Sequence, residues 1–155
     1  MVRWSDGLYG GLIAGLVSAL FFLIAGVVFV HEPVIGNYFV SFAVAVFGSR
    51  IESLPIIGLL FGLFLHFFAA ALFGIFYAIL AARFKPAWTA PTSVLCGLVY
   101  GCFMFFIAED VAVPVMRVVS YTPLWEALLG NILFHGIVIS EYITIAHRRH
   151  IAGLA

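Results

Sequence analysis

The sequence predicts an all-α integral membrane protein, a bundle of four transmembrane helices that forms a single domain over residues 1–155. Composition is the first observation: 65% of the residues are hydrophobic and 9% are charged, whereas a soluble domain has about 25% charged residues. The second is the run Ile56–Leu80, which has no charged residue. Because lipid cannot satisfy exposed backbone and about 20 residues cross the hydrocarbon, this run is expected to be a membrane span.

Four stretches are long and apolar enough for such spans, at residues 8–30, 56–80, 91–108 and 124–146. Small residues recur at helical spacing along the first, at Gly7, Gly11, Gly15 and Ser18. The third repeats this spacing with Gly97 and Gly101. Such seams let another helix approach closely, so they predict helix–helix contacts.

The connection between the first two spans contains a further apolar stretch, Tyr38–Phe47. It is too short to cross the bilayer. We therefore expect a short interfacial or re-entrant helix there, after Pro33 and before Pro55.

Basic residues predict the orientation. With four spans, both termini and the loop 81–90 share one side, which holds most of the cations: Arg3, Arg83, Lys85, Arg148 and Arg149. The positive-inside rule then places both termini in the cytoplasm. The opposite side is acidic, with Glu32, Glu52, Glu109, Asp110 and Glu126.

A weak internal repeat relates the two halves of the chain. The second span reads LLFGLFLHFF and the fourth LLGNILFHGI, while the first and third share Gly-Leu-x-x-Gly at Gly11–Gly15 and Gly97–Gly101. The pattern is consistent with a parallel duplication of a helical hairpin.

His66 and His135 are the sharpest candidate site. Each lies ten or eleven residues into a span that runs from outside to inside, which places both at a depth of about 16 Å. Two imidazoles at one depth on neighbouring helices are what a bis-histidine haem b requires, so both are candidate axial ligands. The alternative is that each ring is neutral and hydrogen-bonds a group on a neighbouring helix.

Glu141 and Asn131, on the last span, are candidate proton-handling residues. An ionisable group inside a span is a candidate for function. The alternative for Glu141 is that it reaches toward the interface or pairs with Arg83 or Arg3.

The outer rim offers a candidate metal site, because imidazole and carboxylate groups from two span ends converge there. The candidate ligands are His31, Glu32, Glu109 and Asp110. A solvated acidic rim is the alternative.

Several function classes find no support. Seven cationic and seven acidic side chains give zero net charge, which leaves no basic surface for nucleic acid. The sequence has no Ser-His-Asp pattern, glycine-rich phosphate loop or HExxH motif, so nothing indicates hydrolysis or nucleotide binding.

The third and fourth spans carry short motifs, which are Gly97-Leu-Val-Tyr-Gly101, Ala108-Glu-Asp-Val-Ala-Val-Pro114, Pro123, Leu133-Phe-His135-Gly136 and Arg148-Arg149. In these motifs the chain resembles the YagU-like family of small bacterial inner-membrane proteins. The resemblance implies a four-helix fold in the inner membrane. It implies little about activity, since the family has only a loose association with acid tolerance. The chain departs from the family in its longer connection, Val34–Leu54.

The first functional expectation is a non-enzymatic protein, either an accessory or scaffold subunit of a larger membrane complex or a protein of envelope homeostasis. Its partners would be the lipid bilayer and other membrane subunits or further copies of itself. One alternative is a haem b subunit that exchanges electrons with quinone through His66 and His135. The other is a small oligomeric transporter or proton-conducting protein that uses Glu141, Asn131 and the histidines.

Overall fold

The structure is a computed structural model that describes residues 2–30, 37–84, 88–108 and 123–153. In this part of the chain every regular element is helical, so the prediction of an all-α protein is confirmed. The elements are α1 (Trp4–Ala25), the π-helical turn η1 (Gly26–Val30), α2 (Asn37–Phe47), the 3₁₀ helix η2 (Ser49–Ser53), α3 (Pro55–Phe84), α4 (Ala90–Phe106), α6 (Leu124–Leu129), the π-helical segment η4 (Gly130–Ile137) and α7 (Val138–Ile151).

Among the described residues, three helices are long and apolar enough to cross a membrane, namely Trp4–Phe29, Pro55–Phe84 and Leu124–Ile151. They correspond to the first, second and fourth predicted spans and agree with the prediction of a membrane protein. The third predicted span corresponds to α4, which is apolar but has only 17 residues. Its length is about 25 Å, which is shorter than the hydrocarbon core of about 30 Å.

The three long helices extend beyond the predicted ends. α1 begins at Trp4 rather than Leu8, because the Asp6 carboxylate accepts a hydrogen bond of 2.8 Å from the backbone N–H of Arg3. A carboxylate in the first turn stabilises a helix N-terminus. α3 continues to Phe84 because alanine and arginine favour helix even where the apolar run has ended.

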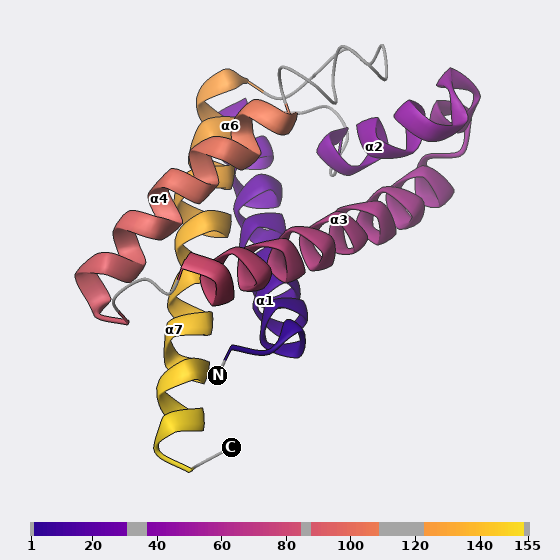
Figure 1. Cartoon of the computed structure of the whole chain (residues 1–155). Helices are drawn as coiled ribbons and strands as arrows, with labels where there is room; N and C mark the ends of the chain where they lie inside the picture. The colour runs from indigo at the N-terminus through magenta and orange to yellow at the C-terminus, as the bar shows by residue number, and fades with distance from the viewer. Residues whose placement is uncertain (1, 31–36, 85–87, 109–122, 154–155) are drawn as a thin grey trace.

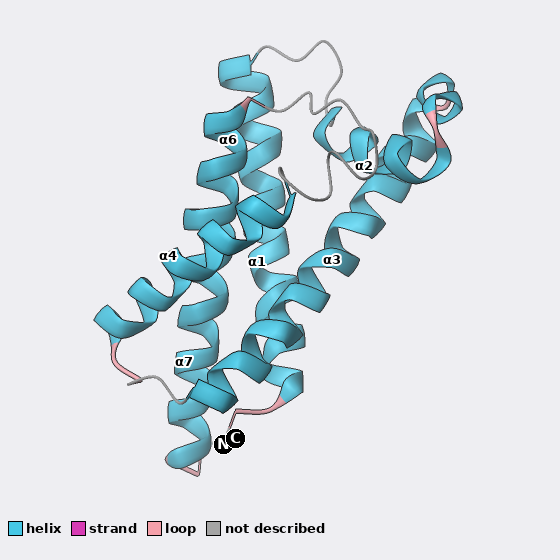
Figure 2. Cartoon of the chain, turned by 45° about the horizontal axis from the view of Figure 1, so that its top comes forward, coloured by secondary structure: helices cyan, strands magenta, loops and turns pink. Residues whose placement is uncertain are grey.

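α1 and α7 run side by side, and α3 crosses them at a steep angle (Figure 1). α2 packs against the first half of α3, away from α7 (Figures 1 and 2). Near the opposite end of α3, the start of α1 and the end of α7 come together (Figure 2). The first turn of α1 and the last turn of α7 therefore lie at the same end of the molecule.

Two helix interfaces are formed by glycines, as the small-residue seams predict. The glycines are Gly7, Gly11 and Gly74 between α1 and α3, and Gly97, Gly101 and Gly136 between α4 and η4. A Cβ atom on Gly74 would lie 2.6 Å from the Cα atom of Gly11, and one on Gly136 would lie 2.7 Å from that of Gly101. Neither backbone leaves room for a side chain, so glycine is required at both contacts.

The glycine contacts recur in the two halves of the chain, but in a different register from the predicted repeat. Gly7 and Gly11 contact Gly74 in the way that Gly97 and Gly101 contact Gly136. The predicted repeat instead aligns Gly11 and Gly15 with Gly97 and Gly101, which differs by one helical turn. His66 lies eight residues before Gly74, whereas His135 directly precedes Gly136. The glycine geometry recurs, but the two histidines are not at equivalent positions in it.

α2 confirms the prediction of a short helix in the first connection. Phe39 and Ala43 are fully buried, and a Cβ atom on Gly62 of α3 would overlap the carbonyl of Phe39. Gly62 thus lets the two helices pack closely, and α2 covers the part of α3 that precedes His66.

The last helix is interrupted by η4, whereas the sequence predicts a regular span at 124–146. Gly130 and Gly136 mark the segment, with Gly130 against the ring of Phe22 and Gly136 against Gly97. A π-helical stretch changes which side chains face the neighbouring helices and is frequent at functional sites. This one contains both Asn131 and His135.

Candidate functional site

The structure brings His66 of α3 and His135 of η4 to the same hydroxyl group. The Oγ atom of Ser18, on α1, lies 3.2 Å from Nδ1 of His135 and 3.5 Å from Nε2 of His66. All three side chains are buried, with at most 5% of each residue exposed. We call Ser18, His66 and His135 the histidine cluster.

The neighbouring acceptors indicate which nitrogen and oxygen atoms of the histidine cluster carry hydrogen. Nε2 of His66 lies 2.9 Å from the carbonyl oxygen of Gly15, which only accepts, so this nitrogen carries the hydrogen. The Ser18 hydroxyl has one hydrogen and two neighbours at 3.2 Å, the Gly15 carbonyl and Nδ1 of His135. Whichever it donates to, Nε2 of His135 is buried and has no hydrogen-bond partner among the described residues.

Aromatic rings surround His66. Those of Tyr38, Phe39 and Phe42 on α2 and of Phe67 on α3 have centroids 5.3–6.2 Å from the imidazole and stand nearly perpendicular to it. Edge-to-face packing of this kind is favourable and excludes water. α2 thus closes the cluster on the side of His66.

The cluster does not fit a haem between the two histidines. A bis-histidine haem places its ring nitrogens on opposite faces of a flat macrocycle. Here both rings meet the Ser18 hydroxyl, and His66 also bonds to Gly15 on the same helix. α1 therefore occupies the space that a macrocycle would need, and the geometry agrees with the alternative of hydrogen-bonded rings.

A second buried cluster joins α3, α4 and α7 through the side-chain hydroxyl groups of four residues. We call it the hydroxyl cluster: Tyr77, Ser93, Ser140 and Thr144. Ser140 Oγ lies 2.6 Å from Tyr77 Oη and donates to the carbonyl of Ser93 at 2.7 Å. Thr144 donates to the Ser93 hydroxyl at 3.1 Å. Sequence reasoning missed this cluster because single hydroxyls in apolar helices are common.

The predicted proton-handling residues lie outside the histidine cluster. The side-chain amide of Asn131 donates to the carbonyl of Ala127 on its own helix at 2.9 Å. The Oε1 atom of Glu141 is buried and has no hydrogen-bond partner among the described residues. The predicted ion pair of Glu141 with Arg83 or Arg3 is not present, although all three residues are described.

The predicted outer-rim metal site cannot be placed. Its four candidate ligands, His31, Glu32, Glu109 and Asp110, lie outside the described residues. Elsewhere in the described chain, no group of three or more His, Cys, Asp and Glu side chains has a metal-binding arrangement. Glu126, which the sequence assigns to the acidic outer side, is buried within the first turn of α6 with 1% of its surface exposed.

Sequence reasoning also missed Ser18 as a site residue. It was visible only as a small residue of the first seam, although a hydroxyl within a seam of glycines is a signal for an interhelical hydrogen bond. Comparisons of the chain with family models, with curated proteins and with solved structures found no match. The resemblance to the YagU-like family therefore stays a prediction.

Proposed function

We propose that this chain crosses the bacterial inner membrane four times, with both termini in the cytoplasm, and is a non-enzymatic subunit of a larger membrane assembly. The fourth crossing would be made by α4. It packs against η4 through Gly97 and Gly101 and also contacts α7, and its 17 residues reach the lower limit of a spanning helix.

The observation that carries the subunit role is the exposed surface of α3. Large apolar side chains at every fourth residue form a ridge that winds about the helix: Ile56, Leu60, Phe64, Phe68 and Leu72. Each is at least 52% exposed. The rings of Phe64 and Phe68 stack with centroids 6.2 Å apart, which places two aromatic rings in the middle of the ridge.

α3, which carries the ridge, is the least covered of the three long helices. In an 18-residue apolar window of α3, 22% of the residues are buried, compared with 39% in such a window of each of the other two. Lipid covers any such surface, but a ridge of large side chains at four-residue spacing also fits the groove of a second helix. We assign this ridge to a contact with a helix of another subunit.

Site-specific photocrosslinking in native membranes tests the assignment. A benzophenone amino acid at Phe64, which is 63% exposed, is compared with one at Leu20 on α1, which is 51% exposed. We expect a protein adduct from position 64 and only lipid adducts from position 20. Lipid adducts alone at both positions would contradict the proposal.

A second candidate function, proton handling, is favoured by two buried polar atoms that have no partner in the described part of the chain, Nε2 of His135 and Oε1 of Glu141. Both lie on the last long helix. Unpaired polar groups inside a span are candidate relay positions. Proteoliposomes loaded with a pH-sensitive dye would show slower proton flux with His135→Leu and Glu141→Gln than with wild type or with the exposed-site control Ser53→Ala. Equal flux in all four proteins would exclude this function.

A further inference from the structure

A hollow of about 160 Å³ lies where the first turn of α1 meets the last turns of α7. Its volume is that of about five water molecules in the liquid, so it has room for a small polar group. The lining residues are Asp6, Tyr142, Ile145, Ala146, Arg149 and His150.

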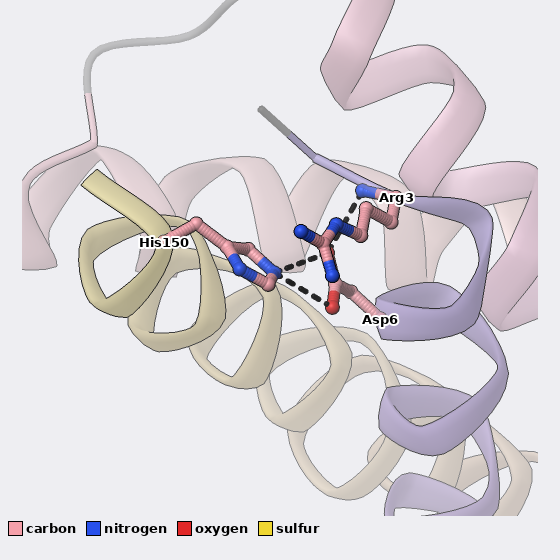
Figure 3. A network of polar contacts seen from close by, with 3 residues as sticks. All are labelled: Arg3, Asp6 and His150. Atoms are coloured by element: carbon pink, nitrogen blue, oxygen red, sulfur yellow. Dashed lines mark hydrogen bonds and ion pairs between the residues drawn. The ribbon is translucent and has the colours of Figure 1, made fainter. Parts of the chain in front are cut away.

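The acidic group in the hollow is already engaged. Nε2 of His150 lies 3.1 and 3.2 Å from the two carboxylate oxygens of Asp6, and the backbone N–H of Arg3 donates to Oδ2 (Figure 3). These contacts join the start of α1 to the end of α7. They also use the acceptor sites of Asp6, so its carboxylate leaves little capacity for a further cation.

Arg149 supplies the cationic group that is not engaged. Its guanidinium makes no hydrogen bond or ion pair with any residue that the structure describes. Its neighbour Arg148 differs, because it donates two hydrogen bonds to the carbonyl of Trp88 at 2.6 and 2.9 Å. The planar guanidinium presents paired donors that match a phosphate group.

The other wall of the hollow is apolar and belongs to a membrane-spanning helix. Ile145 and Ala146 line it, and Ile145 is 46% exposed on the flank of α7. A cationic group at the end of a span, next to an apolar flank, is the combination of features expected of a phospholipid headgroup site. The dipoles of α1 and α7 oppose each other at this point, so the guanidinium determines the preference for an anion.

We propose that the hollow binds a phosphate-bearing anion, with Arg149 as the principal contact and Tyr142 and His150 beside it. The same chemistry is offered by the headgroup of an anionic phospholipid and by free phosphate. This site does not depend on the proposed subunit role, because it lies at the junction of α1 and α7 rather than on the ridge of α3.

The experiment uses the full chain in nanodiscs of three kinds: phosphatidylcholine alone, phosphatidylcholine with phosphatidylglycerol, and phosphatidylcholine with inorganic phosphate in the buffer. The unfolding temperature is followed by intrinsic tryptophan fluorescence, and retained lipids are counted by native mass spectrometry. Wild type is compared with Arg149→Gln and with Arg83→Gln. Arg83 is exposed and does not line the hollow, so its variant matches the loss of charge.

For a headgroup site we expect phosphatidylglycerol to raise the unfolding temperature by a few degrees. Arg149→Gln should abolish this rise and the retention of phosphatidylglycerol, while Arg83→Gln should keep both. A rise that inorganic phosphate produces, and that also requires Arg149, assigns the site to free phosphate. No rise or retention with either anion, or equal losses in the two variants, would overturn the proposal.

Discussion

The two buried polar clusters hold different sets of helices and differ in how completely they are satisfied. The hydroxyl cluster joins α3, α4 and α7, and every side-chain oxygen in it has a partner. The histidine cluster joins α1, α3 and η4, and it leaves Nε2 of His135 without a partner among the described residues.

The chemistry of the groups explains this difference. A hydroxyl donates one hydrogen bond, accepts two and rotates freely, so several hydroxyls close a network by themselves. A neutral imidazole has one donor and one acceptor, which are fixed on different sides of a rigid ring. Once Nδ1 of His135 faces Ser18, its Nε2 points elsewhere. The first cluster is therefore suited to holding helices together, and the second leaves one polar atom unpaired among the described residues.

The largest effect is expected at the centre of the hydroxyl cluster. Ser140→Ala removes the group that contacts the Tyr77 hydroxyl and both the hydroxyl and carbonyl of Ser93. We expect the free energy of unfolding to fall by about 2 kcal/mol, because buried polar groups lose their partners. Reversible unfolding in mixed micelles measures this change. Ser53→Ala is the control, since Ser53 is exposed and bonds only to the carbonyl of Arg50. Equal stability of the two variants would remove the distinction between the clusters.

An intermediate effect is expected for His66→Leu. The variant loses the hydrogen bond to the Gly15 carbonyl but retains an apolar side chain among the surrounding aromatic rings. A loss of about 1 kcal/mol is expected, the typical net value of one hydrogen bond. A double-mutant cycle with Ser18→Ala should show little coupling, because Ser18 Oγ is 3.5 Å from the ring nitrogen. Coupling larger than the loss from His66→Leu itself would mean that the cluster acts as one network.

The smallest effect is expected for His135→Leu. This variant loses one contact to Ser18 but also removes a buried nitrogen that has no partner, and the two terms offset each other. The Ser18 hydroxyl still has the Gly15 carbonyl at 3.2 Å. Stability within about 0.5 kcal/mol of wild type is therefore expected, measured by the same unfolding transition. A loss as large as that of Ser140→Ala would show that His135 has a mainly structural role.

That the two histidines lie near each other in the bundle could be predicted, whereas their shared partner could not. Their common level follows from the fixed rise of a helix, because each lies a similar number of residues into its span. Which residue of α1 lies between the rings depends on how far each helix is rotated about its axis. That rotation is set by glycine contacts such as Gly11 with Gly74, which involve residues far apart in the chain.

The burial of Glu126 was not predicted for a related reason. In the sequence it lies at the polar start of a span, where a carboxylate ordinarily remains exposed. In the structure the first turn of α6 carries it into the bundle, with 1% of its surface exposed. A local sequence pattern does not reveal which other elements pack against the end of a helix.

The sequence by itself was enough to predict a membrane environment and helical secondary structure. Long apolar runs, small-residue seams and the prolines that bracket α2 were enough to predict helices in a membrane, because lipid permits no other way to satisfy the backbone of a spanning segment. It also located the two buried histidines and the short helix of the first connection.

Only the tertiary structure decided which polar atoms meet. The shared contact of both histidines with Ser18 and the pairing of Asp6 with His150 join residues 48 to 144 positions apart. α1 and α3 have apolar residues on most of their surface, so hydrophobic periodicity gives little guide to their rotation. Close glycine contacts and a few buried hydrogen bonds fix it instead.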